Sequence, residues 1–389
     1  MGHRAVRLAY VTETYPPEIN GVALTVDRFV RGLRARGHAV DLVRPRQPHE
    51  SKCENRSEWR SPGIPIPMYQ DLRIGLPLIS RLTKRWSVSR PQLVHVATEG
   101  PLGWAAIRAA RTIGVPVTSD FRTNFDQYSK HYGFGWLRGI VGGYLKHFHN
   151  ATDRTFVPTM AVSKALTQQG FLRTEVVGRG VDPENFSPLH ASEKLRAGWR
   201  ADERTPVLLY VGRLASEKNV PLAFRAFEAV RARLPGVRFI VVGDGPMRKK
   251  LSRSHPDAIF AGPQRGAALA EYYASADIFL FPSLTETFGN VTLEALASGL
   301  LVVAFRSGAA AVHIDDCTSG LLVEPGDEQG FIASACALAH QFRWLGMMRS
   351  GARRAGVAAN WDAVINRFEL CLSGAAHAIQ VPIAGSCPA

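Results

Sequence analysis

Apolar runs of strand length alternate with helical patterns along this chain. Residues 7–11 and 39–43 are short and largely apolar, as buried strands are, and over 22–36 apolar residues recur at helical spacing. Strand, helix and strand in this order predict a βαβ unit and therefore a parallel sheet. The same order returns later in the chain, at 207–211, 220–234 and 239–242. We therefore expect an α/β protein with two similar, doubly wound domains, each with a glycine-bearing loop after its first strand.

Turn-forming residues indicate where the two domains meet. They concentrate in 181–188, which places the first domain at 1–185 and the second at 186–360. An amphipathic pattern over 360–372 predicts one last helix. Residues 44–75 contain many Pro, Arg and Ser residues and little periodicity, so we expect them to form a long surface excursion.

The composition narrows the class of protein. The 389 residues are 46% hydrophobic and 21% charged, a globular mixture that excludes a disordered chain or a coiled coil. No apolar run approaches the roughly 18 residues of a membrane-spanning helix, and the first residues lack the apolar core of a signal peptide. The five cysteines lie far apart without a Cys-x-x-Cys pair. We therefore expect neither a disulfide framework nor a zinc site, and a reducing cytosol fits.

Positive charge is concentrated in the first half of the chain. The net charge is +14, of which residues 1–190 carry +11 (26 Lys and Arg against 15 Asp and Glu) and residues 191–389 carry +3. This asymmetry favours a polyanion facing the first half, either nucleic acid or an anionic membrane surface. The alternative interpretation is an organism whose proteins are rich in arginine.

The segment 283–295 (Ser-Leu-Thr-Glu-Thr-Phe-Gly-Asn-Val-Thr-Leu-Glu-Ala) follows an apolar strand and begins a helix. Free N–H groups at a helix start bind anions, so a diphosphate would be held at Phe288, Gly289, Asn290 and Val291. Glu294 can accept hydrogen bonds from two sugar hydroxyls, and Glu286 can reach the far side of the same ligand. The alternative, acids that complement the helix dipole, does not explain one acid in the loop and a second eight residues later.

The loop after the second domain's first strand carries two cations. Arg213 and Lys218, five residues apart, can converge on one pyrophosphate; otherwise they belong to a solvated surface loop. Residues 242–246 (Val-Gly-Asp-Gly-Pro) lack the six-position glycine pattern of a dinucleotide site, which disfavours nicotinamide. The absence of an Asp-x-Asp motif disfavours a transferase that clamps its donor through a metal.

The order of these motifs resembles that of the retaining glycosyltransferases of family four, over nearly the whole chain. The motifs on which this resemblance rests are Gly-Arg-x4-Lys, Val-Gly-Asp-Gly-Pro and Ser-x2-Glu-Thr-Phe-Gly-Asn-x3-Glu-Ala. Residues 12–22 and 178–182 are similar to the branch that holds bacterial GDP-mannose-dependent mannosyltransferases and sulfoquinovosyl-diacylglycerol synthases. The resemblance implies the GT-B fold, with two Rossmann-like domains facing a cleft. It also implies that a last helix, 361–377, crosses back to the first domain.

The resemblance also assigns roles to residues. Arg213 and Lys218 would neutralise the donor diphosphate, Glu294 would hold the ribose hydroxyls, and Glu286 would contact the transferred sugar. The N–H groups of 288–291 would bind sugar and phosphate. No metal and no cofactor would be needed, because these cationic groups and N–H groups supply the positive field.

Further contacts implied by the resemblance concern the N-terminal domain and the nucleobase. Gly21 would bring the N-terminal loop against the phosphates, and the loop 261–269 would line the base. The resemblance does not decide whether the donor is a UDP-sugar or a GDP-sugar. Arg122 stands where relatives commonly have the His of Tyr-His-Thr-Asn, beside the donor sugar. We expect Arg122 to contact that sugar, and its fixed positive charge would suit an acidic sugar. The alternative is that Arg122 pairs with Asp120 or Asp126.

The activity implied is transfer of a mannosyl or glucosyl group, with retention, from a nucleotide sugar to a membrane lipid or glycan. Retention in this class is thought to proceed by front-face attack, so we expect no paired-carboxylate acid/base couple. The basic first half favours a cytoplasmic protein that is peripheral on the inner face of the cytoplasmic membrane. A sugar-nucleotide epimerase of the same fold is an alternative. A nucleic-acid-binding protein is disfavoured, because zinc spacing, a basic helix and interleaved aromatic residues are missing.

Overall fold

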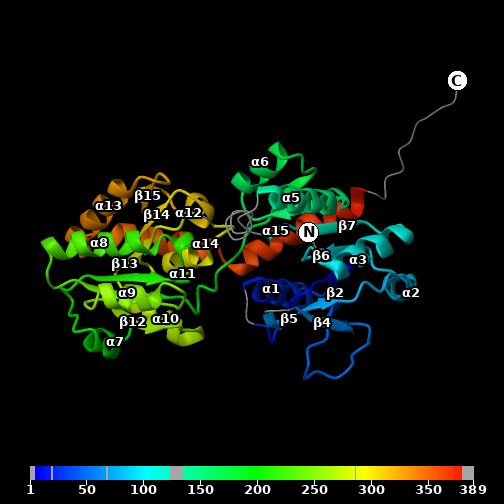
Figure 1. Cartoon of the computed structure of the whole chain (residues 1–389), viewed down its shortest axis with the longest axis horizontal. Coiled ribbons are helices and arrows are strands. Elements are labelled where there is room, and N and C mark those ends of the chain that lie inside the picture. Colours follow the sequence, from blue (N-terminus) through cyan, green and yellow to red (C-terminus); the bar gives the residue numbers. More distant parts are fainter. Residues whose placement is uncertain (1–4, 19–20, 67–68, 123–134, 285, 379–389) are drawn as a thin grey trace. The chain divides into compact units, whose positions relative to one another are not determined.

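The computed structural model describes residues 5–18, 21–66, 69–122, 135–284 and 286–378 (Figure 1). The chain divides into two compact units. Unit 1 comprises residues 1–178 and 364–389, and unit 2 comprises residues 179–363. Each unit is an α/β layer structure built on a parallel sheet.

Unit 1 contains a seven-stranded parallel sheet in the order β3-β2-β1-β6-β7-β8-β9. Its strands are β1 Arg7–Val11, β2 Ala39–Pro45, β3 Glu58–Ser61, β6 Leu93–Val96, β7 Val117–Asp120, β8 Arg154–Val157 and β9 Thr174–Val176. Its helices are α1 Gly21–Ala35, α2 Ile79–Ser89, α3 Pro101–Thr112, α5 Gly135–Asn150, α6 Met160–Gln168 and most of α15 Trp361–Ala378. Because successive strand residues point to opposite faces, Ala9 and Val11 pack with α2 and α3, whereas Tyr10 lies beside Phe368 of α15.

The surface excursion expected over 44–75 is correct for residues 48–57, which are exposed or half-buried, but strands lie on both sides of them. Residue 45 still belongs to β2, and β3 pairs with β2 in parallel at the edge of the sheet. Strands β4 Gly63–Ile66 and β5 Tyr69–Gly75 then form an antiparallel hairpin. Trp59 explains the strand, because its side chain is 3% exposed and joins the core shared with α2 and α3. One buried aromatic residue in a polar stretch carries too weak a periodic signal to predict a strand.

Unit 2 repeats the plan with a six-stranded parallel sheet in the order β12-β11-β10-β13-β14-β15. Its strands are β10 Val207–Val211, β11 Arg238–Val242, β12 Ile259–Gly262, β13 Ile278–Phe281, β14 Leu301–Phe305 and β15 Leu321–Val323. Its helices are α7 Glu193–Gly198, α8 Val220–Arg233, α9 Arg248–Ser254, α10 Gly266–Ser275, α11 Asn290–Ala297, α12 Gly308–His313, α13 Glu328–Gln341 and α14 Gly346–Ala358, with the short helices η1 Pro188–His190 and η2 Ser216–Lys218.

Both faces of the unit 2 sheet are buried, as expected for parallel strands. Leu208 and Tyr210 of β10 face the cluster formed with α8 and α13. Leu209 and Val211 face the opposite cluster, to which α10, α11, α12 and α14 contribute. This explains why β10 is a continuous apolar run rather than an alternating one.

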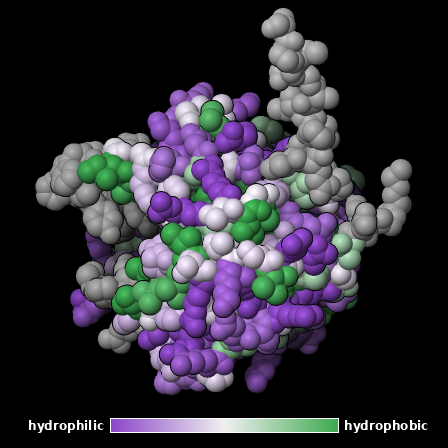
Figure 2. Space-filling view, turned by 90° about the vertical axis from the view of Figure 1, so that its right-hand side faces the viewer, coloured by the Kyte–Doolittle hydropathy of each residue, from purple (hydrophilic) through white to green (hydrophobic). Residues whose placement is uncertain are grey.

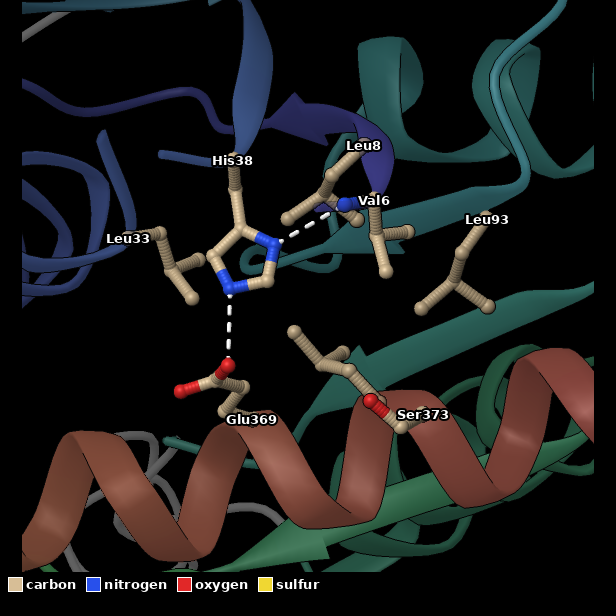
Figure 3. Close-up of a pocket in the computed structure, with 8 residues that line it drawn as sticks. Val6, Leu8, Leu33, His38, Leu93, Glu369 and Ser373 are labelled. Carbon is tan, nitrogen blue, oxygen red and sulfur yellow. Dashed lines mark hydrogen bonds and ion pairs between the residues drawn. The ribbon is translucent and has the colours of Figure 1, made fainter. Parts of the chain in front are cut away.

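The last helix, α15, is held against unit 1 from Val364 onward. Phe368 is fully buried, with its ring centroid 4.4 Å from that of Phe29. The Val6 N–H donates to His38 Nδ1 at 3.1 Å, so Nε2 carries the ring proton and donates to Glu369 at 3.0 Å (Figure 3). Helix α15 is therefore fixed both by apolar packing and by a buried polar contact.

The first boundary in the structure lies at 178/179, before the turn-rich residues at which the sequence places it. The Val181 N–H donates to the Ala359 carbonyl at 3.0 Å, and the Phe186 ring lies edge-on to Tyr273 in the unit 2 core. These contacts attach residues 179–185 to unit 2. The second boundary, at 363/364, falls inside the first turn of α15.

Candidate active site

Both sheets have a topological switch point, where the strand order reverses. In unit 2 the chain runs outward from β10 through β11 to β12, and then returns to place β13 on the other side of β10. In open α/β sheets, ligands bind beside the carboxyl ends of the strands at such a point. The loops that follow β10 and β13 carry the residues predicted to bind the diphosphate and the sugar.

Lys218 and Glu286 are brought together by this arrangement. Lys218 ends η2 after β10, Glu286 follows β13, and the Lys218 ammonium forms an ion pair with Glu286 Oε1. The two side chains are 18% and 9% exposed, so the pair is largely shielded from water. Gly289 adopts a left-handed φ of 90°, and a Cβ there would lie 3.4 Å from Glu286 Cγ. The site therefore assembles the two predicted catalytic charges beside the start of α11.

Arg213 lies on the same loop but is more accessible. Its side chain is 58% exposed and approaches Glu217 at 3.6 Å. In this structure Arg213 and Lys218 have different acidic partners. Their predicted convergence on one pyrophosphate remains a prediction.

The start of α11 offers polar groups that the protein itself does not satisfy. Gly289 is the N-cap residue, and no side chain caps the helix. Among the described residues, three buried side-chain oxygens near this helix start lack a hydrogen-bond partner: Ser283 Oγ, Asn290 Oδ1 and Thr292 Oγ1. Phe288 as a whole is 1% exposed, and its carbonyl accepts from the Ala309 N–H at 2.5 Å, so its predicted contact with a ligand remains a prediction. Buried polar atoms are normally paired, so this cluster fits a polar ligand such as a sugar diphosphate.

Glu294 lies one turn further along α11. Its Oε2 accepts a hydrogen bond from the Tyr273 hydroxyl at 2.9 Å. Burial raises the pKa of Glu294 to about 7, and the Tyr273 hydrogen bond opposes this shift. The sequence contains no signal for this contact, because Tyr273 lies on another helix, α10, 21 residues away.

The glycines of residues 242–246 have a packing role. Gly243 has a φ of 133°, and a Cβ there would lie 2.0 Å from the Gly212 carbonyl oxygen. The loop after β11 therefore packs closely against the start of the Arg213 loop.

In unit 1, Arg122 follows β7 and forms an ion pair with Asp120. Its Nε donates to Asp120 Oδ2 at 2.8 Å, and its Nη2 donates to the same oxygen. His95 Nε2 approaches this oxygen at 3.2 Å. Burial alone would raise the pKa of Asp120, but Arg122 and His95 lower it to about 2. Pairing with Asp120 was the alternative interpretation of Arg122; Asp126 lies outside the described residues, and the predicted sugar contact remains a prediction.

Two more residues lie near the carboxyl end of β1. Gly21 is the first residue of α1, and its carbonyl accepts from Thr25 Oγ1 at 2.6 Å. Glu13 accepts the N–H groups of Gly75 at 2.5 Å and Leu102 at 2.8 Å, and burial raises its pKa to about 7. The Glu13 carboxylate therefore occupies the anion-binding start of α3, a role that the sequence does not indicate.

Comparison with solved structures shows the fold. The chain resembles the sucrose-phosphate synthase structure from Thermosynechococcus elongatus with a TM-score of 0.73 at 18% identity, over 96% of this chain and 100% of that one. It resembles the lipopolysaccharide glycosyltransferase WaaG with a TM-score of 0.68 at 16% identity, over 94% and 100%. These likenesses establish the predicted GT-B fold.

Sequence comparison identifies the family. "Glycosyltransferase Family 4" matches residues 19–185, and "Glycosyl transferases group 1" matches residues 205–341. A GDP-mannose-dependent alpha-mannosyltransferase of Mycolicibacterium smegmatis is 34% identical over 94% of this chain and 98% of that protein. Sulfoquinovosyl transferase SQD2 of Arabidopsis thaliana is 29% identical over 93% and 72%. The chain belongs to the family-four glycosyltransferases and is a glycosyltransferase.

Proposed function

We propose that this enzyme transfers a mannosyl or glucosyl group from a UDP- or GDP-sugar to a membrane lipid or glycan, with retention and without a metal. The observation that carries the proposal is the meeting of Lys218, Glu286 and the start of α11 at one switch point. The GDP-mannose-dependent alpha-mannosyltransferase relative supports the choice of donor class.

The proposed chemistry follows from these groups. The leaving diphosphate takes up negative charge as the sugar–oxygen bond breaks, and stabilising that charge is the largest contribution to the rate. Lys218, Arg213 and the N–H groups at the start of α11 would supply the stabilisation. Glu286 is paired with the Lys218 ammonium, so it suits a role as a fixed acceptor that orients the sugar. The departing diphosphate oxygen would take the acceptor's proton.

The Arg122 ion pair favours a neutral donor sugar. The Asp120 carboxylate balances the guanidinium charge and accepts from its Nε–H and from one of its two Nη2 hydrogens. An arginine neutralised in this way has little charge left to attract an acidic sugar, so we set the uronic or sulfonated sugar aside in favour of a neutral hexose.

The proposed membrane contact is electrostatic. Helices α2 and α3 pack together, contain no acidic residue, and expose the basic residues Arg81, Lys84, Arg108 and Arg111. The face in Figure 2 shows hydrophobic side chains in small separate patches among hydrophilic ones, which suits adsorption rather than insertion. None of the helices in the described ranges is long and apolar enough to cross a bilayer. We therefore place the enzyme at an anionic inner membrane face.

A donor screen tests this proposal. A panel of UDP- and GDP-sugars is scanned by thermal shift, because a ligand at about 100 times its Kd stabilises the folded state by roughly 2.7 kcal/mol. The stabilising donor is then assayed with lipid acceptors, with and without EDTA, and the anomeric configuration of the product is determined by NMR. An inverted product, loss of activity in EDTA, or the absence of any stabilising nucleotide sugar would contradict the corresponding part of the proposal.

A further inference from the structure

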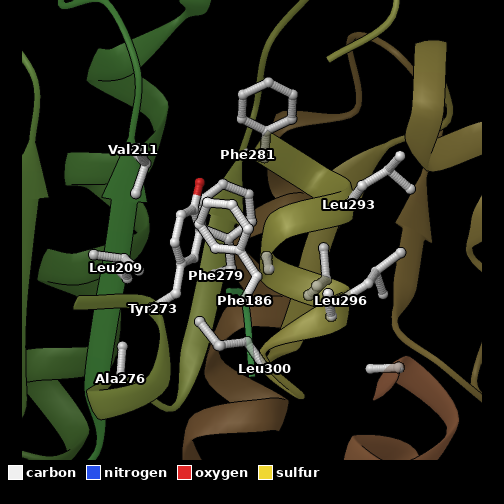
Figure 4. Packing of buried hydrophobic residues seen from close by; sticks show 14 of the residues in the cluster. Phe186, Leu209, Val211, Tyr273, Ala276, Phe279, Phe281, Leu293, Leu296 and Leu300 are labelled. Carbon is white, nitrogen blue, oxygen red and sulfur yellow. The ribbon is translucent and has the colours of Figure 1, made fainter. Parts of the chain in front are cut away.

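The unit 2 core contains a tyrosine whose hydroxyl is not explained by packing. Tyr273 is 0% exposed, with its ring edge-on to Phe186 at 5.6 Å and beside Phe279 at 5.8 Å. In Figure 4 the hydroxyl points in the direction in which β10 runs from Leu209 to Val211. A phenylalanine would fill the same space, and a buried hydroxyl is costly unless it has a partner.

The partner is the Glu294 carboxylate. The Tyr273 hydroxyl donates to Glu294 Oε2 at 2.9 Å and lies 3.4 Å from the Val291 carbonyl. A phenol has one hydrogen to donate, and the carboxylate is both the closer and the stronger acceptor. Burial, and then the Glu294 charge, raise the pKa of Tyr273 well above its ordinary value. Tyr273 therefore remains a donor at every pH at which the enzyme is assayed.

We propose that Tyr273 is a positioning residue for nucleotide binding, which anchors Glu294 Oε2 so that the carboxylate faces the two ribose hydroxyls of a nucleoside diphosphate. The inference rests on the proposed function, and on the expectation from the family resemblance that Glu294 holds the ribose hydroxyls of the donor. A glutamate side chain has several rotatable bonds, and ordering it costs entropy when the ligand arrives. A hydrogen bond to a ring already locked in the core supplies that order before binding.

The same contact bears on the protonation of Glu294. Burial raises the pKa of Glu294 to about 7, and the Tyr273 hydrogen bond acts in the opposite direction. Of the charged groups on α14, Arg353 donates to the Ala297 carbonyl, Arg349 pairs with Asp277 and Arg354 is exposed. On α12, burial lowers the pKa of His313, and on α10 Glu271 is exposed. Tyr273 is thus the group that directly favours the ionised carboxylate, which can accept from both ribose hydroxyls.

Removing the Tyr273 hydroxyl should change how nucleotide affinity depends on pH, in a direction that can be predicted. Wild-type affinity for a nucleoside diphosphate should fall as the pH drops through about 7, because Glu294 becomes protonated. Tyr273→Phe removes an influence that lowers the Glu294 pKa, so the midpoint of this fall should move to higher pH. A tyrosine that only filled space would leave the midpoint in place.

Calorimetric titration of the full chain with UDP, GDP and their 2′-deoxy forms, from pH 5.5 to 9, tests the inference. For whichever base binds, wild-type protein should prefer the ribose form by about tenfold or more, the scale of a hydrogen bond to a charged group. Tyr273→Phe should weaken ribose-form binding by about tenfold and leave deoxy-form binding nearly unchanged. Tyr272→Phe is the matched control; this partly buried neighbour packs against Trp199 at 5.6 Å and should behave as wild type.

The titrations distinguish a failure of the Tyr273 positioning role from a failure of the proposed function. Undiminished ribose preference with an unmoved pH midpoint in Tyr273→Phe would overturn the positioning role while leaving the donor site standing. Wild-type protein that binds neither UDP nor GDP would overturn the proposed function itself. Equal weakening toward ribose and deoxy forms would show general loosening of the core, and would also overturn the positioning role.

Discussion

Replacing Lys218 with alanine separates stability from catalysis at the candidate active site. The substitution leaves the Glu286 carboxylate, 9% exposed, without its cation. Removing one partner of a fully buried pair costs about 3–5 kcal/mol. Because both side chains retain some contact with water, we expect a loss of about 2 kcal/mol in the free energy of unfolding. For a unit of this size, that loss lowers the Tm by roughly 4–8 °C.

Urea unfolding measures the stability that the Lys218–Glu286 pair contributes. Four proteins are compared: wild type, Lys218→Ala, Glu286→Gln and the double variant. The double variant carries no unpaired carboxylate, so it should be more stable than Lys218→Ala. We expect a coupling energy of about 1 kcal/mol or more between the two positions.

Turnover should not recover with stability. An ammonium that stabilises the leaving diphosphate cannot be replaced by removing its acidic neighbour, so we expect kcat to fall about 100-fold in Lys218→Ala and at least as far in the double variant, which also loses Glu286. Arg213→Ala should cost about as much, with the Arg213/Lys218 double variant well short of the product. Near-wild-type kcat in either single variant, or recovery of kcat in the Lys218/Glu286 double variant, would refute the reasoning.

Three further variants probe unit 1. Asp120→Asn should lower stability by about 2 kcal/mol at pH 7. Because the pKa of Asp120 is depressed to about 2, its contribution is present above the ordinary aspartate pKa and is lost as the pH falls toward 2; urea unfolding at pH 7 and pH 3 should show the difference shrinking. His38→Ala should destabilise by about 2 kcal/mol in urea, because a buried carboxylate, Glu369, loses a donor. Arg81→Gln with Lys84→Gln should weaken sedimentation with anionic vesicles, with roughly 1 kcal/mol available per charge, and 0.5 M salt should abolish the difference.

Matched controls exist for two of these predictions. His49→Ala removes an exposed histidine and should leave stability unchanged. Arg200→Gln with Arg204→Gln removes two exposed charges from unit 2 and should leave vesicle binding unchanged. Equal weakening by both arginine-containing pairs would assign the binding to net charge, and binding that ignores salt would contradict an electrostatic contact.

Local signals in the sequence were sufficient to predict the repeated βαβ plan and the segment that begins α11. The apolar run of β10 and the helical spacing of α8 depend on residues a few positions apart, so their pattern survives without tertiary information. Glu286, Gly289 and Glu294 lie within nine residues, and a strand, a turn and a helix start place them on one loop and helix. A candidate site could therefore be proposed from the sequence alone.

The partners of those residues were decided by tertiary structure. Lys218 meets Glu286 across 68 residues because β10 and β13 are neighbours in the sheet, and Tyr273 meets Glu294 because α10 and α11 cover the same face. Strand β3 forms because Trp59 packs into a core that is built mainly from other elements. Periodicity reports which side of an element is buried, but contains no information about which element will cover it. Strand order and helix placement settle that question, because the free energy of burial is shared among residues far apart in the chain.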